Sequence, residues 1–294
     1  MNTISLGALP APDVLEALDF EAIYADELAA FRAYMGDQWN AALESDPVVK
    51  LLELGAYRKL QNRARINSAA KALLLSYAGG ADLDQLAANV SLQRLVVREA
   101  DPNAVPPVAR LLESDEALRE RVQLRFEGLT TAGPRNSYVL HARNASGLVG
   151  DASAESPSPA VVVVTVLSVD GDGTAAPAVL DTVYARLSDE DVRPVADRVT
   201  VQSAEVLRYS IDAVVHMEGT GSENEAILAE CRRRLATWIN PRRRLGVEVA
   251  RSAVDAQLHI PGVRRVDLLG WQDIRPTRAQ AAYCESITVA LGDA

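Results

Sequence analysis

Several kinds of residue and pattern are scarce in this chain of 294 residues, and each absence excludes a class of protein. The two cysteines, Cys231 and Cys284, are too few for a disulfide framework or a cysteine-based metal site, so we expect a reducing compartment. No apolar run reaches the roughly 18 residues that would indicate a membrane span. We expect no signal peptide, because the first residues contain neither a basic start nor a long apolar stretch.

The chain also lacks the motifs of the common catalytic sites. It has no nucleophile elbow, no Walker loop, no H-E-x-x-H and no C-x-x-C. The three histidines share no ligand spacing: His141, His216 and His259. Asp170 and Asp172 resemble the start of a calcium loop, but Ala175 stands at the position that requires glycine, so we interpret the segment as a turn. The sequence therefore predicts no catalytic residue, no cofactor and no metal ion.

The composition is that of an ordinary soluble globular protein long enough for about two domains, with 24% charged and 48% hydrophobic residues. The formal net charge of −10 argues against a general nucleic-acid binder. The charge is uneven, because residues 1–46 hold nine acids and one arginine, whereas residues 228–278 hold eleven arginines and five acids. Contacts within one chain and head-to-tail contacts between copies both remain open interpretations.

Aromatic and apolar residues at helical spacing predict a first helix over 14–43, with Asp13 and Glu16 as a capping box. Five of them are candidates for a partner interface: Phe20, Tyr24, Phe31, Met35 and Trp39. An ordinary core helix and a helix in a bundle between subunits are both compatible with this pattern. The two apolar stripes favour more than one packing partner.

A second, unusually long helix is predicted over 47–78, because Asp46-Pro47 is a strong start and Gly79-Gly80 a good stop. At 1.5 Å per residue it would be about 48 Å long, more than the diameter of a small domain. Its ends are apolar and its middle is polar. We therefore expect it to bridge separate partners, and Leu51, Ile66 and Leu73 are candidate interface residues.

The rest of the chain changes character near 151–159, a small, polar, proline-punctuated segment that we interpret as a boundary. Before it we expect helices over 82–89, 115–127 and 137–144, and a proline-rich loop over 101–107. Ser114 is the expected cap of the helix over 115–127, and Gly133-Pro134 is the expected breaker after it. After it we expect strands over 161–169, 205–216, 262–269 and 285–291. Between these strands we expect a helix over 176–187, one opened by a Ser222–Glu225 capping box, and one over 247–258.

These elements predict an α+β protein, with a helical N-terminal half that carries a long helical arm and a mixed α+β C-terminal half. Four segments follow: a helical arm that forms an inter-subunit bundle (1–79), a helical middle domain (80–158), an α/β domain (159–218) and a C-terminal α+β domain for subunit pairing (219–294). Glycines, prolines and small residues favour hinges near 79–81 or 151–159.

Two arginine triplets, 232–234 and 242–244, flank Trp238. Consecutive arginines on a helix point in different directions, so a nucleic-acid patch is disfavoured, whereas a solvated face and a contact with an acidic protein surface stay open. Arg234 and Arg243 are the candidate interface residues from these triplets.

Long segments of the chain resemble the baseplate J-like proteins of contractile phage tails, a family that R-type bacteriocins share. They are residues 80–94, 113–146, 156–174, 187–206 and the motif WINPRRRLG at 238–246. The resemblance implies that relatives often have glycine where this chain has Ala87 and Ser91.

The resemblance implies a structural wedge protein that builds the baseplate ring around the tail tube and helps couple receptor engagement to sheath contraction. Each of six wedges would contain two copies of this protein and one different wedge chain, next to sheath-initiating and tube-proximal baseplate proteins. The implied partners include neither nucleic acid nor membrane, and assembly would take place in the bacterial host cytoplasm. A tail-assembly chaperone or binding module that does not stay in the particle is the alternative, and an enzyme would need a catalytic cluster that the sequence lacks.

Overall fold

The computed structural model describes residues 6–10, 12–36, 39, 43–125, 134–219 and 221–292. The chain divides into two compact units, residues 1–93 and 94–294, each described by itself below. The first unit is helical, and the second combines helices with three small sheets. The predicted α+β class is confirmed.

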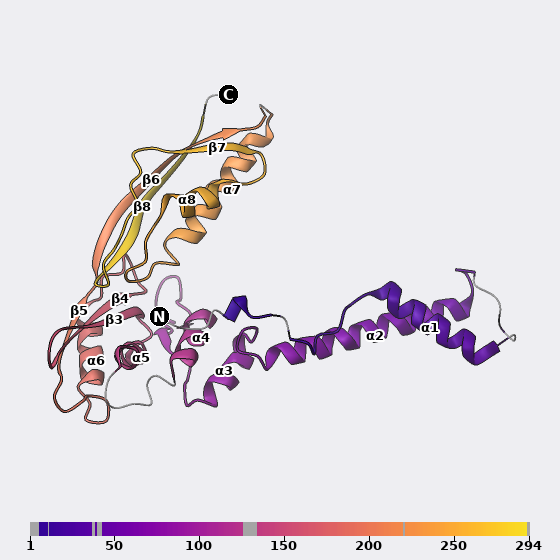
Figure 1. Ribbon diagram of the computed structural model, residues 1–294, viewed down its shortest axis with the longest axis horizontal. Coiled ribbons are helices and arrows are strands. Elements are labelled where there is room, and N and C mark those ends of the chain that lie inside the picture. The colour runs from indigo at the N-terminus through magenta and orange to yellow at the C-terminus, as the bar shows by residue number, and fades with distance from the viewer. Residues whose placement is uncertain are drawn as a thin grey trace. The chain divides into compact units, whose positions relative to one another are not determined.

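The first unit contains a short 3₁₀ turn η1 (Leu6–Ala8) and the helices α1 (Phe20–Met35), α2 (Pro47–Ala72) and α3 (Gly80–Ala88). Helices α1 and α2 lie side by side (Figure 1). They run antiparallel. Glu16, which precedes α1, contacts Asn67 near the end of α2, whereas Glu27 within α1 pairs with Lys59, which lies earlier on α2. The unit is therefore built around a helical hairpin.

Helix α1 begins later than the sequence predicts. Asp19, not Asp13, is its N-cap, and the Asp19 Oδ1 accepts a hydrogen bond of 3.1 Å from the Ala22 N–H. The predicted capping box at Asp13 is therefore wrong, because residues 15–19 carry no helix and instead run beside α2. The helix ends at Met35, before Gly36 at φ 57°. Residues 37–38 and 40–42, also predicted as helical, lie outside the described residues.

Helix α2 begins as predicted, with Asp46 as N-cap, Pro47 in its first turn, and a hydrogen bond of 2.8 Å from the Val48 N–H to the Asp46 carboxylate. It ends at Ala72 instead of residue 78, so its 26 residues span about 39 Å.

Ser91, which follows α3, adopts φ 59°. This is a left-handed conformation that glycine tolerates best, which agrees with the glycine that the family resemblance implies there.

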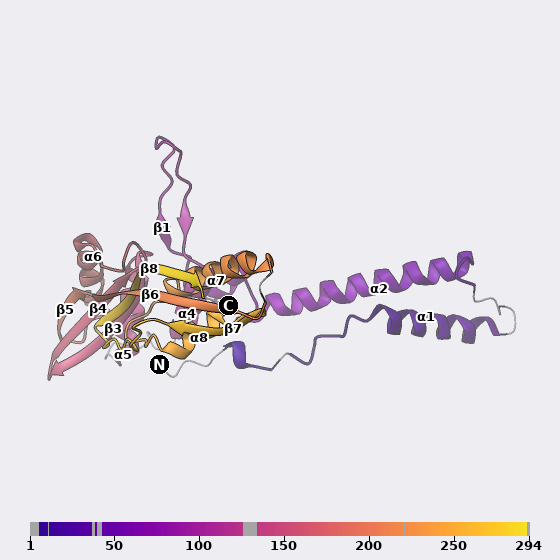
Figure 2. The ribbon, with the colours of Figure 1, turned by 90° about the horizontal axis from the view of Figure 1, so that it is seen from above.

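The second unit begins with an antiparallel hairpin of β1 (Val96–Arg98) and β2 (Leu111–Leu112), which stands out in Figure 2. The expected proline-rich loop 101–107 lies between these strands. Helix α4 (Asp115–Leu124) starts at the predicted cap Ser114, and α5 (Arg135–Ala145) follows. Residues 126–127 of the predicted helix and the expected helix breaker Gly133 lie outside the described residues.

The middle sheet has the order β3 (Val149–Ser158), β4 (Val161–Ser168) and β5 (Arg198–Ser203), with α6 (Pro177–Leu187) between the parallel strands β4 and β5. The expected boundary over 151–159 is wrong, because this segment forms β3 and pairs antiparallel with β4. Small residues such as Ala152 and Ala154 are buried in that strand, where they allow α5 to pack closely. A hinge within 151–159 is therefore no longer expected.

The C-terminal sheet has the order β7 (Val263–Leu268), β6 (Glu205–Met217) and β8 (Gln280–Leu291). Helices α7 (Glu223–Ile239) and α8 (Arg251–Leu258) cover one of its faces (Figure 1). Strand β6, which we placed in the segment 159–218, pairs with strands from the segment 219–294. The predicted capping box of α7 is wrong, because the Ser222 side chain makes no capping hydrogen bond.

One hydrophobic core lies against the middle sheet and another against the C-terminal sheet. A small third cluster joins them, formed by Leu167, Ala204 and Ala281 with Leu245 packed against it. Ala204 is the single residue between β5 and β6, so the chain passes directly from one sheet to the other. This junction holds the two sheets together within the second unit.

Candidate partner-binding surfaces

The helical hairpin of the first unit buries few apolar side chains of its own. Ile23 is the buried residue of α1, and Val49 and Ala56 are the buried apolar residues of α2. The five aromatic and methionine candidates of the α1 region are half-buried: Phe20, Tyr24, Phe31, Met35 and Trp39. Part of their surface is therefore used in the hairpin, and the rest remains accessible.

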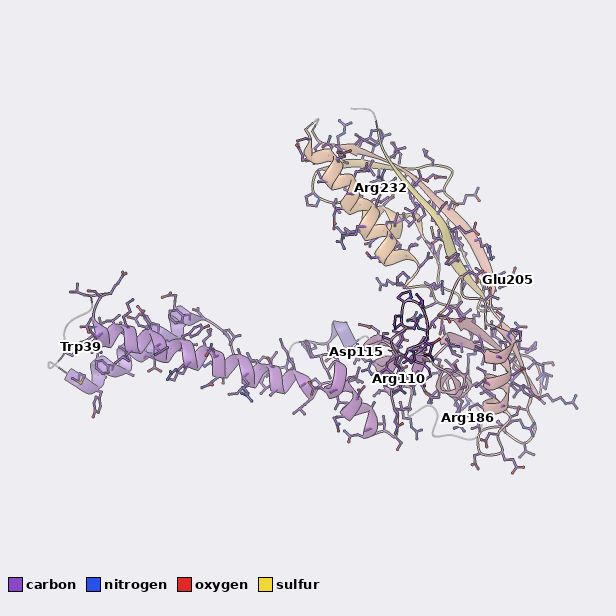
Figure 3. All side chains as sticks on the ribbon, turned by 180° about the vertical axis from the view of Figure 1, so that it is seen from behind. Trp39, Arg110, Asp115, Arg186, Glu205 and Arg232 are labelled. Atoms are coloured by element: carbon purple, nitrogen blue, oxygen red, sulfur yellow. The ribbon has the colours of Figure 1, made fainter. Side chains whose placement is uncertain are left out.

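Two aromatic pairs organise this side of the hairpin. The Phe20 and Tyr24 rings stack with centroids 6.2 Å apart, and Phe31 meets Trp39 edge to face at 5.1 Å. Trp39 lies at the end of the hairpin where α1 is connected to α2 (Figure 3). The Trp39 Nε1 is buried and has no hydrogen-bond partner among the described residues.

Asn67 attaches the extended segment before α1 to α2. Its side-chain amide accepts a hydrogen bond of 3.0 Å from the Glu16 N–H and donates one of 2.8 Å to the Glu16 carbonyl oxygen. Asn67 thus satisfies both backbone groups of one residue, as a neighbouring strand would. Arg63 adds an ion pair of 2.9 Å to the Glu16 carboxylate. These contacts explain why a segment with helical spacing stays extended.

The face of α2 turned away from α1 carries a second stripe of residues, which is apolar towards both ends of the helix and polar in the middle. Its positions recur at steps of three and four residues and so share one side of the helix. We call this set the outer stripe: Leu51, Gly55, Arg58, Asn62, Ile66, Ala69 and Leu73. Leu51, Ile66 and Leu73 are 67%, 55% and 75% exposed. Apolar side chains at heptad-like spacing in water are typical of a helix that packs against another chain.

The first arginine triplet lies on α7 and is only partly free. Arg232 donates from Nε to the Val289 carbonyl oxygen at 3.1 Å, and Arg233 pairs with Glu230 on the helix surface. Arg234, one of the candidate interface residues, is half-buried. As expected for consecutive residues of a helix, the three side chains do not form one basic patch.

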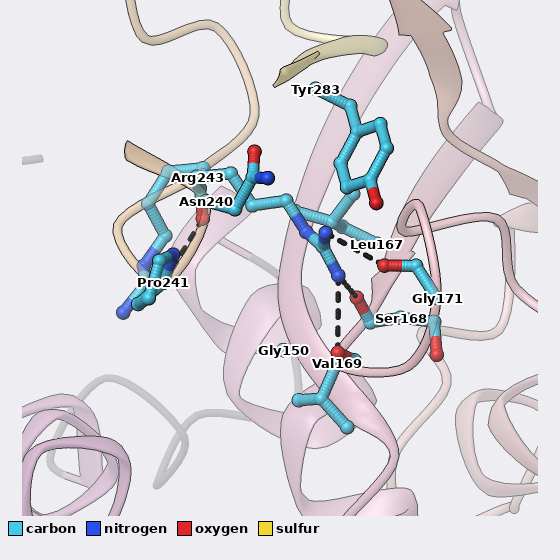
Figure 4. Close-up of a pocket in the computed structure, with 10 residues that line it drawn as sticks. Gly150, Leu167, Ser168, Val169, Gly171, Asn240, Pro241, Arg243 and Tyr283 are labelled. Atoms are coloured by element: carbon cyan, nitrogen blue, oxygen red, sulfur yellow. Dashed lines mark hydrogen bonds between the residues drawn. The ribbon is translucent and has the colours of Figure 1, made fainter. Parts of the chain in front are cut away.

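The second triplet makes contacts within its own chain, between the end of the middle sheet's β4 and the C-terminal sheet, and we call this set of contacts the joint. Arg243 donates to the carbonyl oxygens of Gly171 (2.9 Å), Val169 (3.0 Å) and Ser168 (3.3 Å), and its guanidinium lies 5.5 Å from the centre of the Tyr283 ring (Figure 4). Burial lowers the pKa of Arg243. The guanidinium is therefore committed to its own chain, and we remove Arg243 from the interface candidates.

The residues around Arg243 extend this joint between the two sheets. Arg244 pairs with Glu120 of α4 at 3.3 Å, and the Leu245 N–H donates to the buried Asp151 carboxylate at 3.0 Å. Burial raises the pKa of Asp151, while the bond from Leu245 opposes that rise. A pocket of about 340 Å³ lies beside the joint, between Gly150 and Val169 on one side and Asn240 and Tyr283 on the other.

A buried ion pair that the sequence reasoning missed supports α4. Arg121 and Glu113, both nearly inaccessible, form an ion pair, and Arg121 Nε donates to Asn144 of α5 at 2.7 Å. The Glu113 carboxylate also accepts the Leu95 N–H at 3.0 Å, just before β1. No local spacing indicates this arrangement, because the partners come from separate elements.

The described residues contain no group of three or more histidine, cysteine, aspartate or glutamate side chains able to hold a metal ion. None of the described helices is both long enough and apolar enough to cross a membrane. The Asp170–Gly173 segment is a turn, as interpreted, in which Asp172 accepts the Thr174 N–H and pairs with Arg208.

Comparison with known proteins identifies the family. Residues 44–101 match the model of the baseplate J-like N-terminal domain, and residues 130–203 match that of the baseplate J-like central domain. The chain is 44% identical over 299 residues to baseplate protein J of Escherichia phage P2, with 99% of each chain covered. The chain belongs to the baseplate J-like family.

The two family domains correspond to separate parts of this baseplate J-like chain. The N-terminal domain match spans α2, α3 and β1, and the central domain match spans α5, α6 and the middle sheet. A chain in the anti-feeding prophage baseplate, solved by cryo-electron microscopy, is also similar, with 16% identity and a TM-score of 0.38. That alignment covers 64% of this chain and 44% of the other.

Proposed function

We propose that this chain is a structural wedge protein of a contractile-tail baseplate. In this proposal two copies join one different wedge chain, and six such wedges surround the tail tube next to sheath-initiating and tube-proximal proteins. Membership of the baseplate J-like family and the full-length similarity to baseplate protein J of phage P2 support a structural component of the baseplate. Both a phage and a phage-tail-like bacteriocin fit this role, and assembly would take place in the host cytoplasm.

The observation that carries the proposal is the outer stripe of α2. Its exposed leucine and isoleucine side chains lie on the opposite side of the helix from Val49 and Ala56, which are buried against α1. Burying Leu51 and Ile66 in a bundle would contribute about 2–4 kcal/mol together, given their exposed fractions. We infer that partner helices cover this stripe, and that the half-buried aromatic residues of the α1 region offer the bundle a second, separate surface.

The coupling of receptor engagement to sheath contraction would require identical copies to occupy unlike surroundings. The segment 79–81 remains the proposed hinge for this movement. Gly80 has φ 54°, and a Cβ added to it would meet no neighbouring atom. Glycine adopts this left-handed conformation and its alternatives at little cost, which supports a change of chain direction at this position.

The proposal is tested by placing charge on the outer stripe. The double variant Leu51→Glu/Ile66→Glu should weaken binding of the neighbouring wedge chain roughly 30- to 1,000-fold, measured by titration of the co-expressed partner. The matched control Gln61→Glu/Ser68→Glu adds the same charge at exposed positions outside the stripe and should leave the affinity within about threefold. Equal affinities for both variants would refute the assignment of this surface.

A further inference from the structure

The two edges of the C-terminal sheet differ. On β8, the Asn240 side-chain amide accepts the Cys284 N–H and donates to the Cys284 carbonyl oxygen, both at 3.0 Å. Further along β8, Arg232 donates to the Val289 carbonyl oxygen. Side chains of α7 and its following loop therefore occupy backbone groups along this edge and oppose the addition of another strand.

Strand β7 forms the other edge, and beyond it no described strand follows in the sheet. The Leu269 N–H donates to the Asp212 carbonyl oxygen at 2.8 Å, while Leu268 stands opposite Ala213. In an antiparallel ladder this pattern turns the N–H and C=O groups of Leu268 and Val266 away from β6. The edge of β7 thus offers backbone groups to a further strand.

We propose that β7 pairs antiparallel with β7 of a second copy of this chain, about a two-fold axis that passes through Val266. The inference rests on the proposed function, in which two copies of the chain pair, and it assigns that pairing to the edge of β7. A two-fold axis brings the same strand of both copies together, so one exposed edge serves as both halves of the interface.

The charges of β7 select this register. With Val266 on the axis, Arg265 stands directly opposite Asp267 of the second copy, and the pair occurs twice. An axis through position 265 would set arginine against arginine, and an axis through position 267 would set aspartate against aspartate, both of which are destabilising. Within one chain the Arg265 Nε already lies 3.0 Å from the Asp267 carboxylate, so both side chains lie on the same face of the sheet. Only the central register places opposite charges across the new pair.

Charge reversal tests the pairing with the full chain in the absence of the wedge chain, so that the proposed bundle does not itself hold two copies together, and each variant is checked for native circular dichroism. Arg265→Asp and Asp267→Arg should each weaken self-association at least tenfold in sedimentation equilibrium. The double variant R265D/D267R should restore it to within about threefold, because the opposite charges face each other again. Thr288→Asp, an exposed change on β8, is the control and should have no effect.

The outcomes separate this inference from the proposed function. A wild-type chain that does not self-associate would refute the pairing of copies itself, together with this surface. If the wild-type chain pairs and both single-reversal variants pair with the same affinity, the β7 assignment alone is overturned. In the paired register, positions 265 and 267 of different copies have Cα atoms about 4.5 Å apart. Mixing Arg265→Cys with Asp267→Cys should therefore yield a disulfide-linked dimer under oxidation, and its absence would also overturn the assignment.

Discussion

Replacing Arg243 with alanine should destabilise the second unit by loosening the joint between its two sheets. One guanidinium donates hydrogen bonds to three carbonyl oxygens, which lie at the end of β4 and in the turn after it. Ser168, the last residue of β4, is itself buried. A further contribution of about 0.5–1 kcal/mol comes from the Tyr283 ring. Together we expect a loss of about 2–4 kcal/mol, because the net value of each bond is reduced by competition with water.

The assay is thermal and urea unfolding followed by tryptophan fluorescence, since Trp238 and Trp271 both pack against the C-terminal core. For a unit of this size the expected loss lowers the midpoint by about 5–15 °C. Arg243→Lys should recover only part of the loss, because an ammonium group lacks the planar fork that reaches several carbonyls.

Arg242→Ala is the matched control, since it removes the same charge from an exposed neighbour. We expect it to change stability by no more than about 0.5 kcal/mol. Equal destabilisation by the two alanine variants would refute the joint and indicate a general effect of net charge.

Two further predictions concern the first unit. Asn67→Leu keeps the branched shape and the number of side-chain heavy atoms but leaves the N–H and C=O of Glu16 without their partner, so it should cost about 1–3 kcal/mol and speed hydrogen exchange over residues 12–19. Unchanged hydrogen exchange there would contradict the role of Asn67 in holding this segment against α2. Ser91→Gly should raise the free energy of unfolding by about 0.5–1 kcal/mol, because it relieves a left-handed backbone conformation. A lower melting temperature in calorimetry would count against it.

The elements that depend on local signals were predictable. Asp46-Pro47 and Ser114 mark helix starts that the structure confirms, and the valine run of β4 and the alternation of β6 indicate strands that are present. These features need only neighbouring residues, so one sequence is enough to predict them.

The elements that depend on contacts with residues far away in the sequence were not predictable from local patterns. The helix expected from Asp13 is replaced by a segment held by Asn67, fifty-one residues beyond Glu16. Strand β3 has the small, proline-containing composition of a linker, and it is a strand because β4 pairs with it and α5 packs on it.

The candidate surface was predicted in the same uneven way. Leu51, Ile66 and Leu73 are exposed, as the apolar ends of the long helix indicated. Arg243 was misjudged, because an arginine in a charged run gives no local sign that three backbone carbonyls surround it. Its role follows only from the meeting of the loop after α7 with the turn after β4.

The mass of the complex formed with the neighbouring wedge chain tests the central claim most directly. For the full chain, native mass spectrometry should find two copies with one partner chain. Deletion of residues 1–79 should abolish that complex while the remaining chain keeps its strand content in circular dichroism. A truncated chain that still assembles with the partner at the same stoichiometry would contradict the assignment of the helical arm as the interface.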